Sequence, residues 1–142
     1  MKTRRLLVDS NIIIYAINSA SPKHTQAKQF VTGSTDELFV AQQNIFESLR
    51  VLTHPKFPNP MNTQSALAAV SSVINRCELI TPDITTSFIS MELIGKYGIK
   101  SNNIFDAYLA ATMLTHEIYA IATDNDGDFG IYEAITVINP FT

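Results

Sequence analysis

The chain lacks several features that define secreted, membrane-spanning or disordered proteins. Its single cysteine, Cys77, cannot form a disulfide within the chain, so no disulfide framework is available. Charged residues make up 16% of the sequence, against about 25% in typical proteins. Apolar residues make up 46%, and this balance excludes a disordered chain. No apolar run approaches the roughly 18 residues of a membrane span, so we expect no membrane association.

The length of 142 residues predicts one domain, covering residues 1–142, because no repeat, linker or low-complexity segment divides it. A chain of this size buries about two-thirds of its unfolded surface and needs no disulfide or metal to fold. The apolar run after the basic N-terminus ends at Asp9, which is too short for a signal-peptide core. We therefore expect a mature cytoplasmic protein.

Lysine and arginine are absent from residues 101–142. The net charge of −3 thus conceals a split, with all 10 basic residues in residues 1–100. Apolar residues surround the acids of the last segment, so the fold must compensate at least some of them. These acids are Asp106, Glu117, Asp124, Asp126, Asp128 and Glu133.

Short apolar segments alternate with helical patterns along the chain. Strands are expected over residues 6–8, 38–41, 79–81, 119–122 and 136–138. Helices are expected over residues 10–17, 22–32, 42–53, 62–75, 83–96 and 102–116. This alternation predicts an α/β fold with a largely parallel sheet. The helix over 102–116 is apolar nearly all round and is expected to be buried.

Local signals refine the expected boundaries. Ser10 or Asn11 is expected to cap the first helix, and Pro22 to lie in the first turn of the second. The proline-rich residues 54–60 predict a surface loop between helices. Phe57 in this loop has two interpretations: stacking on a nucleic-acid base, or packing on its own helices.

Functional sites in such folds gather beyond the carboxyl ends of the strands. This rule places Asp9 and the pair Thr123-Asp124 at the functional edge. Asp9 has an alternative role as a helix cap. Glu47 lies three residues before Arg50 on a predicted helix, so a surface ion pair is its alternative.

Asp106 lies in an unusually apolar helix, in the segment Ile104-Phe105-Asp106-Ala107-Tyr108-Leu109. An ionised carboxylate there costs several kcal/mol unless a cation or strong donors meet it. The first turn of the helix offers some compensation through free N–H groups. A functional role is therefore the favoured interpretation.

A second acidic cluster occupies Thr123-Asp124-Asn125-Asp126-Gly127-Asp128-Phe129. Three carboxylates in five residues repel one another unless they are solvated or share a cation. The spacing fails the EF-hand pattern, because Phe129 and Ile135 stand at its sixth and twelfth positions. A plain polar turn is the alternative.

Together these acids predict a site with oxygen ligands only. The three histidines, His24, His54 and His116, show no metal or relay spacing. Oxygen donors favour Mg²⁺ or Mn²⁺ over zinc. Carboxylate-bound divalent metals commonly serve phosphoryl chemistry.

At these residues the sequence resembles the PIN-domain endoribonucleases, in particular the VapC-like toxins of bacterial type II toxin–antitoxin pairs. Four segments match in order: Leu7-Val8-Asp9-Ser10-Asn11, Asn44-Ile45-Phe46-Glu47, Asn103-Ile104-Phe105-Asp106-Ala107-Tyr108, and the Thr123–Phe129 segment. The resemblance covers nearly the whole chain. It implies a PIN-like three-layer α/β/α sandwich whose central sheet has four to five short strands.

The resemblance also implies a Mg²⁺- or Mn²⁺-dependent endoribonuclease that cleaves single-stranded RNA and leaves 5′-phosphate and 3′-hydroxyl ends. Asp9 and Asp106 are then metal ligands, and Glu47 completes the site or orients the attacking water. The fourth segment departs from the family pattern, which leaves open which of Asp124, Asp126 and Asp128 completes the metal site. Asp128 matches by alignment as a catalytic acid, and Asp124 matches by strand-end position as a metal ligand.

The implied partners are single-stranded RNA, a cognate antitoxin and a second copy of the chain. Ser10, Arg50 and Thr123 are candidate substrate-binding residues. Two alternatives remain open: a PIN nuclease of RNA processing or decay outside a toxin pair, and a degenerate PIN-fold binding module. A haloacid-dehalogenase-type phosphatase is set aside, because Asn11 stands where that class needs a second Asp.

Overall fold

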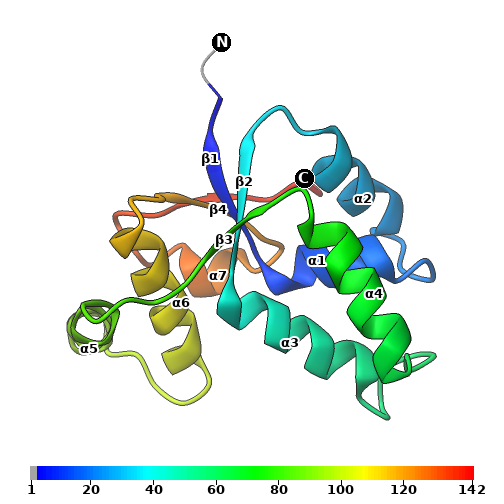
Figure 1. The fold of residues 1–142 in the computed structure, drawn as a ribbon. Coiled ribbons are helices and arrows are strands. Elements are labelled where there is room, and N and C mark those ends of the chain that lie inside the picture. The colour runs from blue at the N-terminus through cyan, green and yellow to red at the C-terminus, as the bar shows by residue number, and fades with distance from the viewer. Residues whose placement is uncertain (1–2) are drawn as a thin grey trace.

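The computed structural model describes residues 3–142 and places five short strands in one sheet (Figure 1). Every pair of neighbouring strands is parallel, in the order β3-β2-β1-β4-β5. The strands are β1 Arg5–Val8, β2 Glu37–Ala41, β3 Glu78–Ile80, β4 Ala120–Ala122 and β5 Thr136–Ile138. The predicted α/β class and parallel sheet are confirmed.

Helices cover both faces of the sheet and complete the three layers (Figure 1). They are α1 Ser10–Ile17, α2 His24–Gly33, α3 Gln42–Thr53, α4 Thr63–Ile74, α5 Thr86–Tyr97, α6 Asn103–Thr115 and α7 Asp126–Phe129. Alternation along β1 explains the two cores, because successive strand side chains point to opposite faces. Leu6 and Val8 pack with α1 and α2, whereas Leu7 packs with α6.

Two local expectations about helix starts were wrong. The cap of α1 is Asp9, whose carboxylate accepts a hydrogen bond from the Ser10 N–H. An aspartate directly after a strand can both end the strand and cap the helix, so neither Ser10 nor Asn11 is needed. Helix α2 begins at His24, which leaves Pro22 in the preceding turn.

Helix α6 is buried less completely than its composition predicts. Its residues 109–113 are buried, but Phe105 in its first turn keeps 61% of its surface exposed. The proline-rich segment does form the connection between α3 and α4, as expected. Phe57 in that loop is half-buried against these two helices, which is the packing alternative.

The strand order reverses at β1, and this reversal positions the site. The chain moves outward from β1 through β2 to β3, then returns to the other side of β1 as β4. Ligand sites of parallel α/β sheets lie where the order reverses, beyond the carboxyl ends of the strands. Asp9 follows β1 and Thr123 follows β4 at this place. None of the helices within residues 3–142 has the length and apolarity needed to cross a membrane.

Candidate active site

Asp9 lies at the carboxyl end of β1 with only 7% of its surface exposed. Its Oδ1 accepts hydrogen bonds from the Ser10 backbone N–H (2.8 Å) and from Asn44 Nδ2 (3.3 Å). Its Oδ2 accepts a hydrogen bond from the Thr123 hydroxyl (2.8 Å). Three donors therefore fix the orientation of this carboxylate and offset part of the cost of its burial.

The pKa of Asp9 is nevertheless raised to about 6, mainly because burial disfavours the charged form. The negative charges of Glu47 and Asp128 raise it further, against the opposing effect of its hydrogen-bond donors. Asp9 is therefore a well-held carboxylate whose charge is repelled by its acidic neighbours.

Glu47 is carried by α3 and faces Asp9 across the end of the sheet. Its Oε2 accepts a hydrogen bond from the Ser10 hydroxyl (3.2 Å), and its Oε1 accepts one from Gln43 Nε2 (2.6 Å). The alternative of an ion pair with Arg50 is not realised, because the ion pairs of residues 3–142 are Arg4–Asp36, Arg5–Glu37 and Lys23–Asp124. Glu47 is held by neutral donors and keeps its charge uncompensated.

Asp106 is half-buried in the first turn of α6, and its pKa is raised to about 7. Burial is the largest cause, followed by the charges of Asp128, Asp9 and Glu47. The same acids act on the pKa of Asp9. Four carboxylates from β1, α3, α6 and α7 therefore converge on one place.

Asp128 reaches this place through a short helix that the sequence did not predict. Residues 126–129 form α7 in what was expected to be a loop or turn. Phe129 is 1% exposed and anchors α7 in the core beneath α6. Asn125 Nδ2 donates a hydrogen bond to Asp128 Oδ2 (2.7 Å), which orients the carboxylate.

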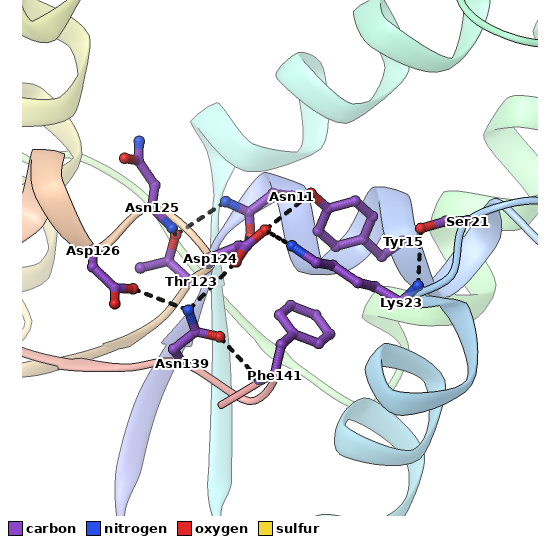
Figure 2. Close-up of polar contacts among 10 residues, drawn as sticks. All are labelled: Asn11, Tyr15, Ser21, Lys23, Thr123, Asp124, Asn125, Asp126, Asn139 and Phe141. Carbon is purple, nitrogen blue, oxygen red and sulfur yellow. Dashed lines mark hydrogen bonds and ion pairs between the residues drawn. The ribbon is translucent and has the colours of Figure 1, made fainter.

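The structure does not bring Asp124 into this cluster. Its carboxylate pairs with Lys23 and accepts hydrogen bonds from the Tyr15 hydroxyl (3.1 Å) and from Asn139 Nδ2 (3.4 Å), as Figure 2 shows. The Lys23 ammonium is the main cause of a lowered pKa at Asp124. Between Asp124 and Asp128 as the last acid, the geometry therefore favours Asp128, and the role of metal ligand predicted for Asp124 has no support from its placement.

The three candidate substrate-binding residues differ in their access. Thr123 is fully buried, and Ser10 is 7% exposed. Their hydroxyls donate hydrogen bonds to Asp9 and Glu47, so both residues hold carboxylates in place and are shielded from a substrate. Arg50 is exposed and lines the cleft described below.

Sequence reasoning missed the amide side chains that orient the acids. Asn44 is fully buried; its Nδ2 donates to Asp9 and to the Ser10 hydroxyl, while its Oδ1 accepts from the Ala41 N–H (3.1 Å) at the start of α3. Gln43 holds Glu47, and Asn125 holds Asp128. Gln43 and Asn125 lie within four residues of the acids they hold, which is a signal the sequence offers, whereas Asn44 lies 35 residues from Asp9.

A cleft of about 750 Å³ opens beside the carboxylates. Glu47 and Asp106 lie in its wall, so at least two of the four acids are accessible to a ligand. The other lining residues are Gln43, Phe46, Arg50, Asn102 and Phe105. The acids thus face an open channel bordered by amides, one cation and two aromatic rings.

The model of the PIN-domain family matches residues 6–133 of the chain. The chain belongs to the PIN-domain family. The sequence is also 25% identical, over 135 residues, to ribonuclease VapC37 of Mycobacterium tuberculosis, with 91% of this chain and 92% of that protein covered. The resemblance to VapC-like PIN domains is therefore confirmed, and the matched region contains all four clustered acids.

Solved PIN-domain structures share the fold. VapBC2 of Rickettsia felis, bound to a fragment of its promoter DNA, superposes with a TM-score of 0.71 at 16% identity, covering 95% of this chain and 98% of that one. VapC20 of M. tuberculosis, a toxin that cleaves the sarcin–ricin loop, gives 0.68 at 14% identity, with 92% and 98% covered. A toxin–antitoxin complex of Klebsiella pneumoniae gives 0.66 at 21%, with 95% and 97% covered.

The donor set of this PIN domain fits a hard divalent cation. All candidate ligand atoms are carboxylate oxygens, and none of the four acids is in an ion pair within residues 3–142. Within that range, no group of three acidic, histidine or cysteine side chains is close enough to form a preformed metal site. An ion would therefore have to draw the carboxylates together, which would also offset their mutual repulsion.

The buried amide of Asn44 gives a first testable prediction. Replacing Asn44 by Ala leaves the Ala41 N–H without its acceptor and removes one donor from Asp9. We expect the free energy of unfolding to fall by about 1–3 kcal/mol, measured by urea denaturation. Gln42→Ala, on the exposed side of the same helix, is the matched control and should change it by less than about 0.5 kcal/mol. Equal stability of the two variants would contradict the role of Asn44.

The raised pKa of Asp106 gives a second prediction, on stability in EDTA. The folded state holds the Asp106 proton up to about pH 7, whereas the unfolded state releases it near 3.8. Between these values the folded state binds more protons, so rising pH costs the wild type stability at this residue. Asp106→Asn removes the cost and should gain stability relative to wild type from pH 5 to pH 8. Because water screens a half-buried group, we expect a gain of about 1–2 kcal/mol.

The control for this prediction is Glu133→Gln, which removes an exposed acid of the same C-terminal segment. Its stability difference from wild type should stay constant over the same pH range. The measurement is a set of urea denaturation curves at several pH values. A pH-independent difference for Asp106→Asn would show that its charge is not repelled in the folded state.

Proposed function

We propose that this PIN domain is a Mg²⁺- or Mn²⁺-dependent endoribonuclease that cleaves single-stranded RNA in the cytoplasm, as the toxin of a type II toxin–antitoxin pair. The observation that carries the proposal is the convergence of Asp9, Glu47, Asp106 and Asp128 beside an open cleft, with no basic side chain among residues 3–142 paired to any of them. Mutually repelling carboxylates are costly in a fold that gains nothing from them, and binding a divalent cation is the usual compensation.

The four acids divide into two roles in this proposal. Asp9, Asp106 and Asp128 would hold the ion, which supplies a Lewis acid that polarises the phosphate and activates water. Glu47, oriented by Ser10 and Gln43, accepts a proton from the attacking water. The new bond between the water oxygen and phosphorus replaces the bond from phosphorus to the 3′ oxygen, which leaves and takes a proton from solvent, so the products carry 5′-phosphate and 3′-hydroxyl ends.

Other residues support these acids or the substrate. The hydrogen bonds from Asn44 and Thr123 keep Asp9 in a single orientation while the reaction proceeds. The guanidinium of Arg50 is exposed in the cleft and would bind an RNA phosphate. Arg50 also brings positive charge to a site whose other charged groups are acids.

The partners follow from what the relatives are. VapC37 is a ribonuclease, and the structures of R. felis and K. pneumoniae are toxin–antitoxin complexes. A cognate antitoxin is therefore proposed for this chain as well, and a homodimer is proposed from its exposed apolar surface. Exposed apolar side chains on α5, among them Phe88 and Met91, are consistent with a protein interface.

Cleavage of a labelled single-stranded RNA tests the nuclease. The purified protein is expected to cut the RNA with Mg²⁺ or Mn²⁺, to stop in EDTA, and to recover when the metal is restored in excess. The 5′ ends of the products should be substrates for a 5′-phosphate-dependent exonuclease. Cleavage that persists in EDTA would contradict the metal-based mechanism.

Induced expression in a bacterial host tests the toxin role separately. Wild-type protein is expected to arrest growth, whereas Asp9→Asn at equal expression is not. If the purified protein cleaves RNA but growth continues, a PIN nuclease of RNA processing or decay becomes the better description. Arrest by both proteins would show that the effect does not depend on the carboxylate site.

A further inference from the structure

Two phenylalanines stand exposed at the edge of the cleft, each directly before a clustered acid. Phe46 precedes Glu47 on α3, and Phe105 precedes Asp106 on α6. Each ring keeps 61% of its surface exposed, although burying a phenylalanine normally stabilises a fold by about 1.5–3 kcal/mol. The exposure follows from helix geometry, because the acids must face the cleft and their neighbours border it.

The two rings belong to one continuous surface. Both line the cleft of about 750 Å³ and also a neighbouring hollow of about 370 Å³. Gln43 lies between them, and its Nε2 donates both to Glu47 Oε1 (2.6 Å) and to the Phe105 carbonyl (3.1 Å). This side chain joins the start of α6 to α3, so the backbone segments that carry both rings are held beside the acids.

Neither ring has an aromatic or cationic partner within residues 3–142. The aromatic pairs there are Tyr15–Phe141 and Tyr97–Tyr132, and the cations that lie over rings contact other aromatic residues. An exposed ring with a free face is suited to stack on a planar ligand. Two such rings beside the same acids indicate a ligand with planar groups next to the group that the acids act on.

The remaining lining residues narrow the ligand class. Arg50 offers a cation for a phosphate, and the exposed amide of Asn102 offers donors and an acceptor for base edges, whereas the Gln43 amide is committed to Glu47 and the Phe105 carbonyl. Aromatic rings, a cation and amides in one groove are the features by which proteins bind unpaired nucleic-acid bases.

We propose that Phe46 and Phe105 form a stacking site for unpaired nucleobases adjacent to the phosphodiester held at the carboxylates. The proposal rests on the proposed ribonuclease function and specifies its substrate: the RNA must be single-stranded at the cleavage point, because paired bases cannot reach the rings. Stacking accepts any base, so these two residues select for strandedness with little selection for sequence.

Binding of RNA without cleavage tests this site. The protein is the cleavage-silent Asp106→Asn variant in Mg²⁺, and the probe is a fluorescein-labelled single-stranded RNA of 12 nucleotides followed by fluorescence anisotropy. Adding Phe46→Leu or Phe105→Leu, which keep apolar bulk but remove the ring, should weaken binding by about five- to thirtyfold each. Tyr119→Leu, directly before β4, is the matched control; this ring is 53% exposed and lies outside both hollows, so the variant should bind as the parent does.

An abasic version of the RNA separates stacking from general loss of affinity. The parent should bind the abasic RNA more weakly, and the two ring variants should bind it as the parent does. Unchanged affinity of both variants for intact RNA, or no RNA binding by the parent, would overturn the proposal. If the ring variants keep their RNA affinity but elute from gel filtration as a smaller particle than the parent, the rings contact a second copy of the chain instead of RNA.

The two proposals fail in distinguishable ways. If wild-type protein cleaves RNA with metal while the ring variants bind normally, the nuclease stands and the stacking site is wrong. If wild-type protein does not cleave but the ring variants lose affinity for intact RNA alone, the stacking site stands and the catalytic assignment is wrong.

Discussion

Asp9→Asn and Asp106→Asn are each expected to reduce metal-dependent cleavage of single-stranded RNA by about a thousandfold. Both substitutions keep the shape of the side chain and remove one negative charge from the cluster. The amide binds a divalent cation more weakly than the carboxylate does, and binding of the ion is what the reaction requires. The measurement is the initial rate at fixed RNA and Mg²⁺ concentrations.

Loss of folding cannot explain the expected result for Asp106→Asn. The negative charges of Asp128, Asp9 and Glu47 repel the Asp106 carboxylate, so its removal should leave the protein at least as stable as wild type at pH 8. Glu133→Gln, an exposed acid outside the cluster, is the control and should cleave at the wild-type rate. Full activity in either cluster variant would contradict the assignment of that acid.

The rate of cleavage at low Mg²⁺ is expected to rise by roughly 10²- to 10³-fold from pH 5 to pH 8. Asp9 and Asp106, with pKa values of about 6 and 7, must both lose their protons before they can bind an ion. Protonated carboxylates are therefore the inactive form, and the rate should level off above about pH 7.

The dependence on metal concentration distinguishes this cause from others. Protons and the ion compete for the same carboxylates, so a higher Mg²⁺ concentration should move the acid limb of the profile to lower pH. The measurement is a pH–rate profile at two Mg²⁺ concentrations. If the acid limb stays at the same pH when the Mg²⁺ concentration is raised, the titrating groups are not the metal ligands.

Much of the site was predictable from the sequence, for identifiable physical reasons. Asp9 was found because a carboxylate ends an apolar strand, and Asp106 because it interrupts an apolar helix. Both signals are local and concern the cost of a charge in apolar surroundings. The parallel sheet followed from apolar segments that alternate with helices.

The choice between Asp124 and Asp128 needed the structure. Both follow β4 closely, and strand-end position alone favours Asp124. Contacts between residues more than a hundred positions apart favour Asp128, because Lys23 pairs with Asp124 while α7 directs Asp128 toward the cluster. No pattern in the sequence predicts a contact between residues so far apart along the chain.

The supporting amides and the exposed rings were missed for the same reason. In the sequence, Asn44 is an ordinary polar residue near the start of a predicted helix, and only the fold brings it into contact with Asp9. Phe105 reads as core in an apolar helix, yet it lies at the cleft edge. Burial of single residues depends on which elements pack beside them.

The central claim is that Asp9, Asp106 and Asp128, without Asp124, hold a divalent metal ion beside Glu47, and that this site cleaves RNA. The Mn²⁺ concentration that gives half-maximal cleavage of single-stranded RNA, compared among wild type, Asp128→Asn and Asp124→Asn, tests it most directly. We predict a rise of about tenfold or more for Asp128→Asn and of less than about threefold for Asp124→Asn. A large rise for Asp124→Asn with none for Asp128→Asn, or cleavage that needs no Mn²⁺ in any of the three proteins, would contradict the claim.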